Sequence, residues 1–154
     1  MTPEVLKFTL KVSVFVAALL LGSWLVAAPS IEPSIEMGTI EGFTNYPSEY
    51  IPVQIVCAEP VNGGAEICAE APAGDTELLS PPWSLSVPAG EYYISSHLKD
   101  PEGIGSDLGD YRAYYTTYVT CGLKYECKDH TKIPVKVEGG ATVTGIAPYD
   151  WYIR

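Results

Sequence analysis

The segment CGLKYECKDH at residues 121–130 brings together two cysteines and a histidine, Cys121, Cys127 and His130. Thiolates and an imidazole bind zinc in a reducing compartment, whereas the same two cysteines form a disulfide in an oxidising one. A zinc site would need a fourth ligand, supplied by His97 or by a cysteine from elsewhere in the chain. The compartment in which the chain folds therefore decides between a metal site and a covalent bridge.

The N-terminal residues 1–30 predict export from the cytoplasm. Lys7 and Lys11 precede an uncharged run at residues 12–31, and a helix of about 20 residues spans the roughly 30 Å hydrocarbon core of a membrane. Lysines before such a run place the N-terminus in the cytoplasm. The segment is therefore a signal peptide or a signal anchor, that is, one N-terminal transmembrane or signal helix. Small residues up to Ala28 suit cleavage but Pro29 does not, so we favour an uncleaved anchor that attaches the protein to the membrane.

Export makes disulfides the expected state of the cysteines. The chain contains four cysteines, which form two pairs that are close in sequence. Four cysteines allow three connectivities, and short loops are entropically the easiest to close. We therefore predict the bridges Cys57–Cys68 and Cys121–Cys127, and no metal site or cofactor.

Composition limits the partners and the architecture. The 154 residues carry a net charge of -10, so the chain repels a phosphate backbone and nucleic acid is not an expected partner. The sequence is 47% hydrophobic and contains 14 glycines and 13 prolines, which favours short strands joined by tight turns over long helices. This length supports one domain and a short appendage.

Alternation of apolar and polar residues predicts short strands throughout residues 38–154, after a linker at residues 31–37. Turn sequences at residues 61–64, 88–90 and 139–140 predict hairpins between successive strands. The expected fold is all-β, a seven-stranded antiparallel β-sandwich. Its predicted strands lie in the segments GTIEGFT, IPVQIVCAEP, AEICAEA, WSLSV, EYYISSHL, KIPVKV and ATVTGIA.

A tyrosine-rich segment follows the fifth of these strands. Tyr111, Tyr114, Tyr115 and Tyr118 stand at helical spacing, which would place all four rings on one helical face. With Asp110 as the N-cap, this pattern predicts a short helix at residues 110–119. Thr116, Thr117 and Val119 favour a strand instead.

The segment WSLSVPAGEYYISS, together with GTIEG, IPVQIVC and IPVKVEGGATVTGIAP, resembles the carboxypeptidase regulatory-like domain family. The resemblance covers residues 38–150. It implies a transthyretin-like (prealbumin-like, Ig-like) seven-stranded sandwich that serves as an accessory module of exported proteins. The family as a whole implies neither an active site nor a cofactor.

No motif of a known catalytic class accompanies the two histidines, so we do not expect an enzyme. An acidic loop that contains Asp100, Glu102, Asp107 and Asp110 could hold calcium, but its spacing is not that of an EF-hand and a solvated loop is favoured.

Tyrosine serves both to cover a core and to contact a protein or a sugar, and packing against the sandwich is the favoured role of this stripe. For rings that stay exposed, the predicted binding residues are Tyr111, Arg112, Tyr114, Tyr115 and Tyr118. The expected function is that of a non-enzymatic extracytoplasmic interaction module, membrane-tethered or secreted, for a protein or glycan partner. The alternative is a ligand-binding or calcium-binding accessory subunit of an exported enzyme or uptake complex.

Overall fold

The computed structural model describes residues 34–75, 80–100 and 111–152. The predicted signal or transmembrane segment, residues 1–30, and the acidic residues Glu102, Asp107 and Asp110 lie outside this part of the chain. Within the described ranges, no helix has the length and apolar character needed to cross a membrane.

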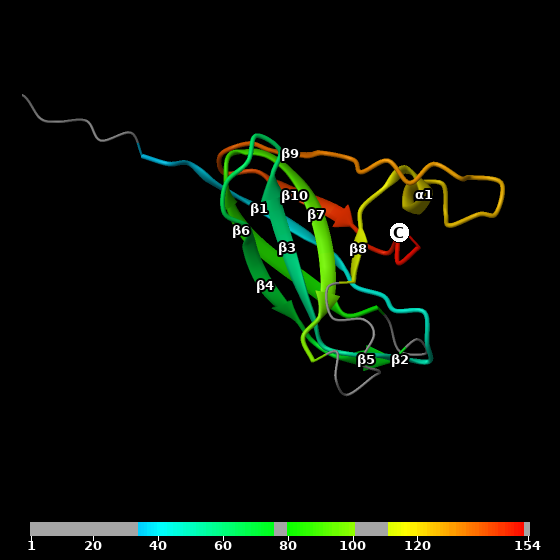
Figure 1. Ribbon diagram of the computed structural model, residues 1–154. Coiled ribbons are helices and arrows are strands. Elements are labelled where there is room, and N and C mark those ends of the chain that lie inside the picture. Colours follow the sequence, from blue (N-terminus) through cyan, green and yellow to red (C-terminus); the bar gives the residue numbers. More distant parts are fainter. Residues whose placement is uncertain (1–33, 76–79, 101–110, 153–154) are drawn as a thin grey trace, which may run out of the picture. The chain divides into compact units, whose positions relative to one another are not determined.

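Two sheets form a β-sandwich (Figure 1). The first has the order β10-β1-β6 and the second has β4-β3-β7 followed by β8, with β9 also paired to β7. The short strands β2 and β5 form a separate pair. The elements are β1 (Met37–Phe43), β2 (Tyr50–Ile51), β3 (Gln54–Pro60), β4 (Ile67–Ala71), β5 (Gly74–Asp75), β6 (Pro82–Pro88), β7 (Gly90–Leu98), β8 (Arg112–Tyr114), α1 (Thr117–Thr120), β9 (Val135–Val137) and β10 (Thr142–Ile146).

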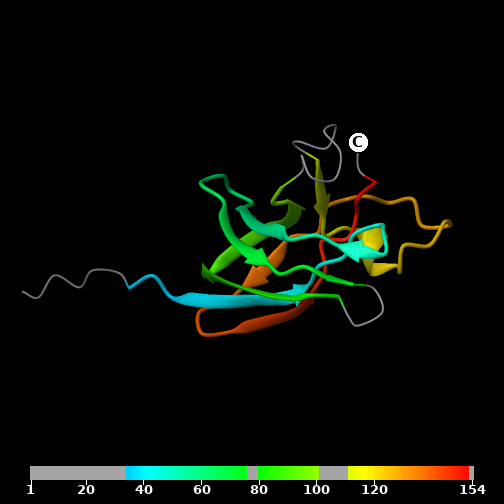
Figure 2. The same ribbon diagram turned by 90° about the horizontal axis from the view of Figure 1, so that it is seen from below.

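The first sheet corrects the expectation of a purely antiparallel sandwich. β1 pairs antiparallel with β6 but parallel with β10, so Thr39 lies opposite Thr142 in a parallel register. Figure 2 shows β10 lying beside β1. The first and last strands of the fold are therefore direct neighbours that run in the same direction.

Two of the three predicted hairpins are wrong. The turn at Ala89 follows β6, which belongs to the first sheet, and leads into β7 of the second sheet. The turn at Gly139 and Gly140 likewise leads from β9, on β7, to β10, on β1. Both turns carry the chain across the sandwich. Only the turn at residues 61–64 makes a hairpin, between β3 and β4.

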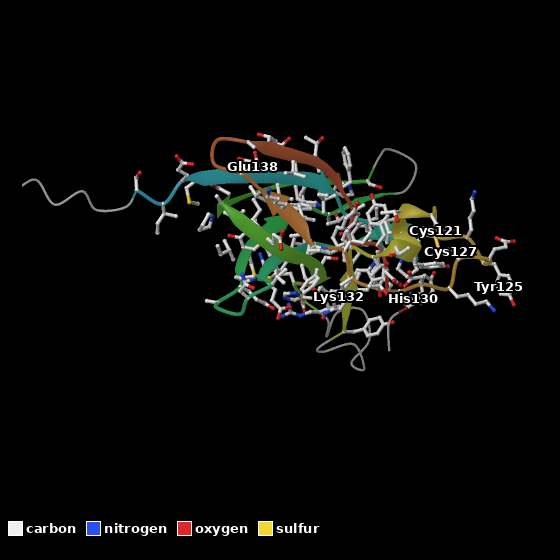
Figure 3. The ribbon with its side chains drawn as sticks, turned by 90° about the horizontal axis from the view of Figure 1, so that it is seen from above. Cys121, Tyr125, Cys127, His130, Lys132 and Glu138 are labelled. Carbon is white, nitrogen blue, oxygen red and sulfur yellow. A yellow bond between two sulfur atoms is a disulfide. The ribbon has the colours of Figure 1, made fainter. Side chains whose placement is uncertain are left out.

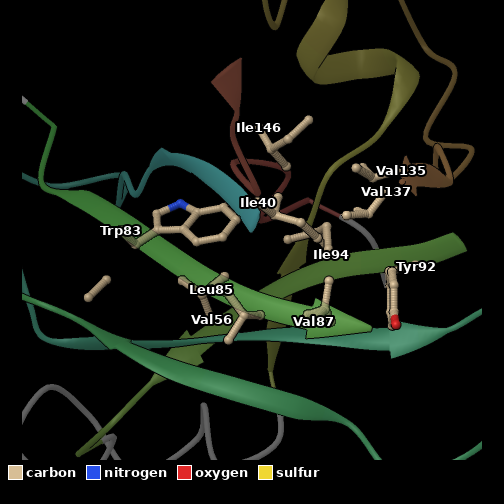
Figure 4. Close-up of a cluster of buried hydrophobic side chains, with 12 residues drawn as sticks. Ile40, Val56, Trp83, Leu85, Val87, Tyr92, Ile94, Val135, Val137 and Ile146 are labelled. Atoms are coloured by element: carbon tan, nitrogen blue, oxygen red, sulfur yellow. The ribbon is translucent and has the colours of Figure 1, made fainter. Parts of the chain in front are cut away.

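The core lies between the two sheets (Figure 4). On β6, Trp83, Leu85 and Val87 are buried while Ser84 and Ser86 are exposed, which confirms the predicted alternation. Apolar side chains from both sheets complete the cluster, and burial of each such side chain stabilises the fold by about 1.5 to 3 kcal/mol. The labelled members are Ile40, Val56, Trp83, Leu85, Val87, Tyr92, Ile94, Val135, Val137 and Ile146.

The helix predicted at residues 110–119 is wrong for residues 111–116, and only residues 117–119 of the described part are helical. Residues 112–114 form β8, which pairs with Ser95, Ser96 and His97 of β7, and α1 starts only at Thr117 and lasts four residues. Backbone pairing with an existing sheet edge outweighs the helical spacing of the tyrosines, because local propensity is a weak preference that tertiary contacts override. The β-branched residues did not mark the strand either, because Thr117 and Val119 lie in α1 and β8 consists of Arg112, Ala113 and Tyr114.

Candidate interaction surface

One edge of the second sheet is interrupted by an excursion of the chain, residues 115–134, here called the 115–134 loop. β8 pairs with the end of β7 and β9 pairs with its beginning, so the loop leaves the sheet between them. Its base is a short antiparallel ladder, in which Thr117 N donates to Thr131 O at 3.0 Å and Ile133 N donates to Tyr115 O at 3.0 Å. The loop thus continues the sheet before it turns back.

Both predicted disulfides are confirmed. Cys57 and Cys68 are direct cross-strand partners on β3 and β4, with Cα atoms 4.1 Å apart. Cys121 and Cys127 close the outer part of the 115–134 loop, with Cα atoms 6.5 Å apart. Because both sulfur atoms of each pair are bonded to one another, neither pair offers the thiolates that the zinc hypothesis requires.

Glu66 lies beside the first bridge, and together with Cys57 and Cys68 it forms the one grouping of potential metal ligands in the described ranges. The disulfide removes two of these three ligands. For the second pair, His130 is directed to a carboxylate rather than to sulfur: its Nδ1 lies 2.7 Å from Oδ2 of Asp150. The geometry therefore assigns covalent bridges to both pairs.

Asp150 is the buried centre of the loop's base. Its side chain has no exposed surface, and its Oδ2 accepts a second hydrogen bond from Thr116 Oγ1 at 2.7 Å. The backbone of Asp150 pairs with that of Tyr114 in both directions, at 3.1 and 3.3 Å. A buried carboxylate needs such partners, since burial without them costs several kcal/mol. Asp150 thereby ties the C-terminal segment to both arms of the loop.

Aromatic rings cover this polar centre. The ring of Tyr118 lies 4.7 Å from the imidazole of His130 and 6.0 Å from the ring of Tyr152, between centroids. The Tyr118 hydroxyl donates to Leu123 O at 3.1 Å. His130 remains about one third exposed (36%), so its Nδ1 is held by Asp150 while one edge of the ring faces solvent.

Lysine ammonium groups lie on tyrosine rings along the same loop. Lys132 Nζ is 3.7 Å from the centroid of Tyr114 and 5.9 Å from that of Tyr93 on β7. Lys128 Nζ is 5.2 Å from the centroid of Tyr125, which is 82% exposed. We call these five residues the lysine–tyrosine surface. In Figure 3, Lys132, His130 and Tyr125 follow one another toward the tip of the loop.

The lysines of the loop differ from the other described cations in their ionic contacts. Lys99, Arg112 and Lys136 each form a salt bridge with a glutamate. Lys124, Lys128 and Lys132 form none with any carboxylate in the described parts of the chain. Their charge is therefore available to a ligand.

Asp129 precedes His130 in the loop, and its pKa is shifted in the folded protein. Hydrogen bonds from the side chain and backbone of Thr131 lower the pKa of Asp129, with smaller contributions from Thr117 and from the charge of His130. Thr131 N lies 2.9 Å from Asp129 Oδ1, which closes a turn next to His130. Asp129 thus stays ionised and serves the local turn.

The five residues predicted to form one binding face are separated by the structure. Tyr111 packs against the small cluster of Leu98, Ala113 and Trp151, and its hydroxyl donates to Trp151 O. Tyr115 packs against the main core. Arg112 bonds Glu66 at 2.7 Å, Tyr114 lies under Lys132, and Tyr118 lies against His130. Two of the tyrosines therefore cover apolar clusters, and the other three residues lie on the outer surface.

His97 lies in β7 opposite Arg112, beside this outer surface. Burial, together with the nearby Arg112 guanidinium, lowers the pKa of His97, and Glu66 opposes this effect. Its Nδ1 is buried and has no hydrogen-bond partner among the residues that the structure describes. His97 is thus a neutral histidine of β7 that lies outside the 115–134 loop.

A hollow of about 420 Å³ lies on the other side of the 115–134 loop, toward the end of β10. Burial raises the pKa of Tyr149 in its wall, and a hydrogen bond with Ser80 opposes the shift. The hollow is mostly apolar and holds no cluster of charged groups. Its lining consists of Asn45, Tyr115, Val119, Thr120, Gly122, Leu123, Gly145, Ala147 and Tyr149.

Sequence reasoning missed Asp150, Lys132, Tyr93 and Tyr152. Asp150 carried no spacing signal, because its partners Thr116 and His130 are 34 and 20 residues away. A usable signal was present for two of the lysines. Lys128, His130 and Lys132 stand at every second position, which would place all three on one side of an extended segment.

Comparison with known proteins found no matching family model, no similar curated protein and no similar solved structure.

Proposed function

We propose that the protein is a non-enzymatic extracytoplasmic interaction module that holds a partner through the 115–134 loop. The observation that carries this proposal is the lysine–tyrosine surface, whose ammonium groups have no carboxylate partner in the described ranges. The Cys121–Cys127 bridge and the buried Asp150 hold the backbone of the 115–134 loop in place, which lowers the conformational entropy lost on binding.

The loop lies at the end of the sandwich away from the start of β1. At that start, Glu36 O accepts from Ala89 N and Met37 O accepts from Gly140 N, both at 2.8 Å. Asn45, just beyond the end of β1, instead lines the hollow beside the loop. Figure 3 shows Glu138 at one end of the sandwich and Cys121 with Cys127 at the other. The loop and the start of β1 therefore lie at opposite ends of the sandwich.

The extracytoplasmic location and the family assignment form part of the same proposal. Two disulfides support an oxidising, extracytoplasmic compartment. The two-sheet sandwich supports the transthyretin-like, carboxypeptidase regulatory-like assignment. β8 and β9 pair with successive parts of β7, which supports the proposal that they occupy a single strand position of a seven-stranded sandwich.

Crosslinking of the full chain in its native membranes tests the proposed function. The double variant K128Q/K132Q removes two unpaired charges from the loop, and the matched control K99Q/K136Q removes two charges that are paired elsewhere. We expect the wild type and the control to capture the same partner and the loop variant to lose most of it. Equal capture by all three proteins would refute the loop as the binding site.

A further inference from the structure

We propose that the lysine–tyrosine surface binds an acidic polysaccharide, one whose sugars carry carboxylate groups. This inference rests on the proposed function and names the chemistry of its partner. It is carried by three features of the surface: the sign of its charge, the residue types that provide the charge, and the position of each charge on an aromatic ring.

The first feature is that the loop does not share the chain's excess of negative charge. The 115–134 loop contains three lysines, Lys124, Lys128 and Lys132, and two acids, Glu126 and Asp129, so its net charge is 3 − 2 = +1. The whole chain has a net charge of -10. Screening confines electrostatic interactions to about 8 Å at physiological salt, so a ligand on the loop responds to the local charge. The buried carboxylate of Asp150, 2.7 Å from His130, reduces the local count to 3 − 3 = 0. An anionic ligand is therefore favoured at the lysine ammonium groups themselves and is not repelled by the loop as a whole.

The second feature is that lysine, not arginine, carries the charge. Protein interfaces are enriched in arginine and depleted of lysine, because arginine pairs with carboxylates through a rigid fork. Lysine remains a hydrated point charge on a flexible stem. Arg112, the one described arginine, is already paired with Glu66 at 2.7 Å. These residue types suit a hydrated, polyhydroxylated ligand better than the buried centre of a protein interface.

The third feature is that each lysine of the surface lies beside a ring. A tyrosine ring offers an apolar face and a polar hydroxyl, which match the C–H face and the hydroxyl groups of a sugar ring. Lys132 Nζ covers one face of Tyr114, 3.7 Å from the ring centroid, so a sugar would meet this pair at the ammonium. Tyr125 is 82% exposed and Lys128 Nζ lies 5.2 Å from its centroid, so one sugar unit can contact this ring while its carboxylate meets the ammonium.

Two such pairs on one loop match a repeating polymer. Between the two lysines in the sequence, His130 is held by Asp150 through Nδ1 and its side chain is 36% exposed, so the imidazole can also contact the same polymer chain. Each pair provides a modest interaction, and joining two of them on one ligand raises the overall affinity.

The test measures binding of the full chain in detergent to three uronate polymers, polygalacturonate, alginate and hyaluronate, by isothermal titration calorimetry. At least one should bind, and K128Q/K132Q should raise its Kd by about tenfold or more, because each variant side chain loses a charge-assisted contact. K99Q/K136Q should leave the Kd within about twofold. For polygalacturonate, methyl esterification should abolish binding, since the ester removes the negative charge.

Failure of this inference is distinguishable from failure of the proposed function. Binding to poly-L-glutamate or to anionic phospholipid vesicles, but to no uronate polymer, would overturn the polysaccharide proposal while leaving a loop that binds partners. Uronate binding that K128Q/K132Q and K99Q/K136Q weaken equally would overturn it too, because the lysine–tyrosine surface would not be the site. Circular dichroism of each variant verifies that it is folded.

Discussion

Asp150 and His130 join the C-terminal segment to the 115–134 loop: Oδ2 of the fully buried carboxylate lies 2.7 Å from the imidazole Nδ1. Thr116 Oγ1 donates to the same oxygen from the other arm of the loop. One carboxylate thus fixes both arms relative to the sandwich. The surface that we propose for binding depends on this polar centre for its shape.

Replacing Asp150 with Asn should lower the free energy of unfolding by about 2 to 4 kcal/mol. The change removes the charge that His130 and Thr116 face and places an amide NH₂ group in a fully buried site. Urea denaturation followed by tyrosine fluorescence measures this loss. The control Glu138→Gln makes the same chemical change at a 73% exposed side chain and should leave the midpoint unchanged. Equal midpoints for wild type and D150N would show that the pair contributes nothing to stability.

Both disulfides should stabilise the fold by lowering the conformational entropy of the unfolded chain. Changing Cys121 and Cys127 to serine should lower the free energy of unfolding by about 2 kcal/mol. Changing Cys57 and Cys68 should lower it by about 3 kcal/mol, because the Cys57–Cys68 bridge closes the longer loop. Urea midpoints of the two double variants measure these losses. Mass mapping of the wild type without reductant should find both links and no free thiol. Four alkylated cysteines would contradict the assignment.

His97 should make stability depend on pH. In the folded protein, burial and then the charge of Arg112 lower the pKa of His97 below 6.5, which is its value in the unfolded chain. As pH falls through this unfolded-state value, the unfolded chain takes up a proton that the folded chain does not, so the free energy of unfolding decreases until pH reaches the folded-state pKa. Stability from this source is therefore present above pH 6.5 and is lost below it.

The variant His97→Gln isolates this effect, because glutamine does not titrate. The free energy of unfolding of the wild type, relative to that of H97Q, should be higher at about pH 7.5 than at about pH 5. Urea denaturation of both proteins across this range provides the comparison. A constant difference would mean that His97 has the same pKa in the folded and unfolded chains.

Gly42 should tolerate no side chain. A Cβ atom at this position of β1 would overlap the carbonyl oxygen of Ile146 on β10, where the parallel register shifts. Gly42→Ala should therefore lower the free energy of unfolding by about 1 to 3 kcal/mol. Glu41→Ala, at the exposed neighbouring position of the same strand, should change it by less than about 0.5 kcal/mol. Thermal and urea denaturation would show whether the two variants differ.

The sequence was informative where a signal was local. Alternation along Trp83, Leu85 and Val87 predicted a half-buried strand, and the short separation of the cysteines predicted both bridges. It was not informative about strand partners. A tight turn such as the one at Ala89 is equally compatible with a hairpin and with a crossing to the other sheet. Only the shared core, which forms between distant segments, decides between them.

The candidate surface shows the same limit. The helical spacing of the tyrosines was real, but pairing with β7 imposed the period of a strand and placed neighbouring rings on opposite sides. Asp150 could not be linked to His130 from the sequence, because a buried polar contact across 20 residues follows no periodic pattern. The lysines of the loop were visible in the sequence, but whether each has an ionic partner is a property of the fold.

Tyr114 and Tyr115 are adjacent in the chain and should differ in what they do. Tyr115 packs against the main core, whereas Tyr114 lies under the ammonium of Lys132 on the outer surface. Tyr115→Ala should therefore lower the free energy of unfolding by about 2 to 4 kcal/mol. Tyr114→Ala should lower it by less than about 1 kcal/mol, the size of an exposed cation–π contact.

Binding should show the opposite order. Tyr114→Ala removes a ring of the lysine–tyrosine surface, so capture of the crosslinked partner should fall severalfold while the protein stays folded. Tyr115→Ala, assayed well below its melting temperature, should retain capture, since its ring faces the core and not the ligand. Each variant serves as the control for the other. If both lose stability equally and Y114A captures the partner as well as wild type, the tyrosines only cover the sandwich and the binding surface lies elsewhere.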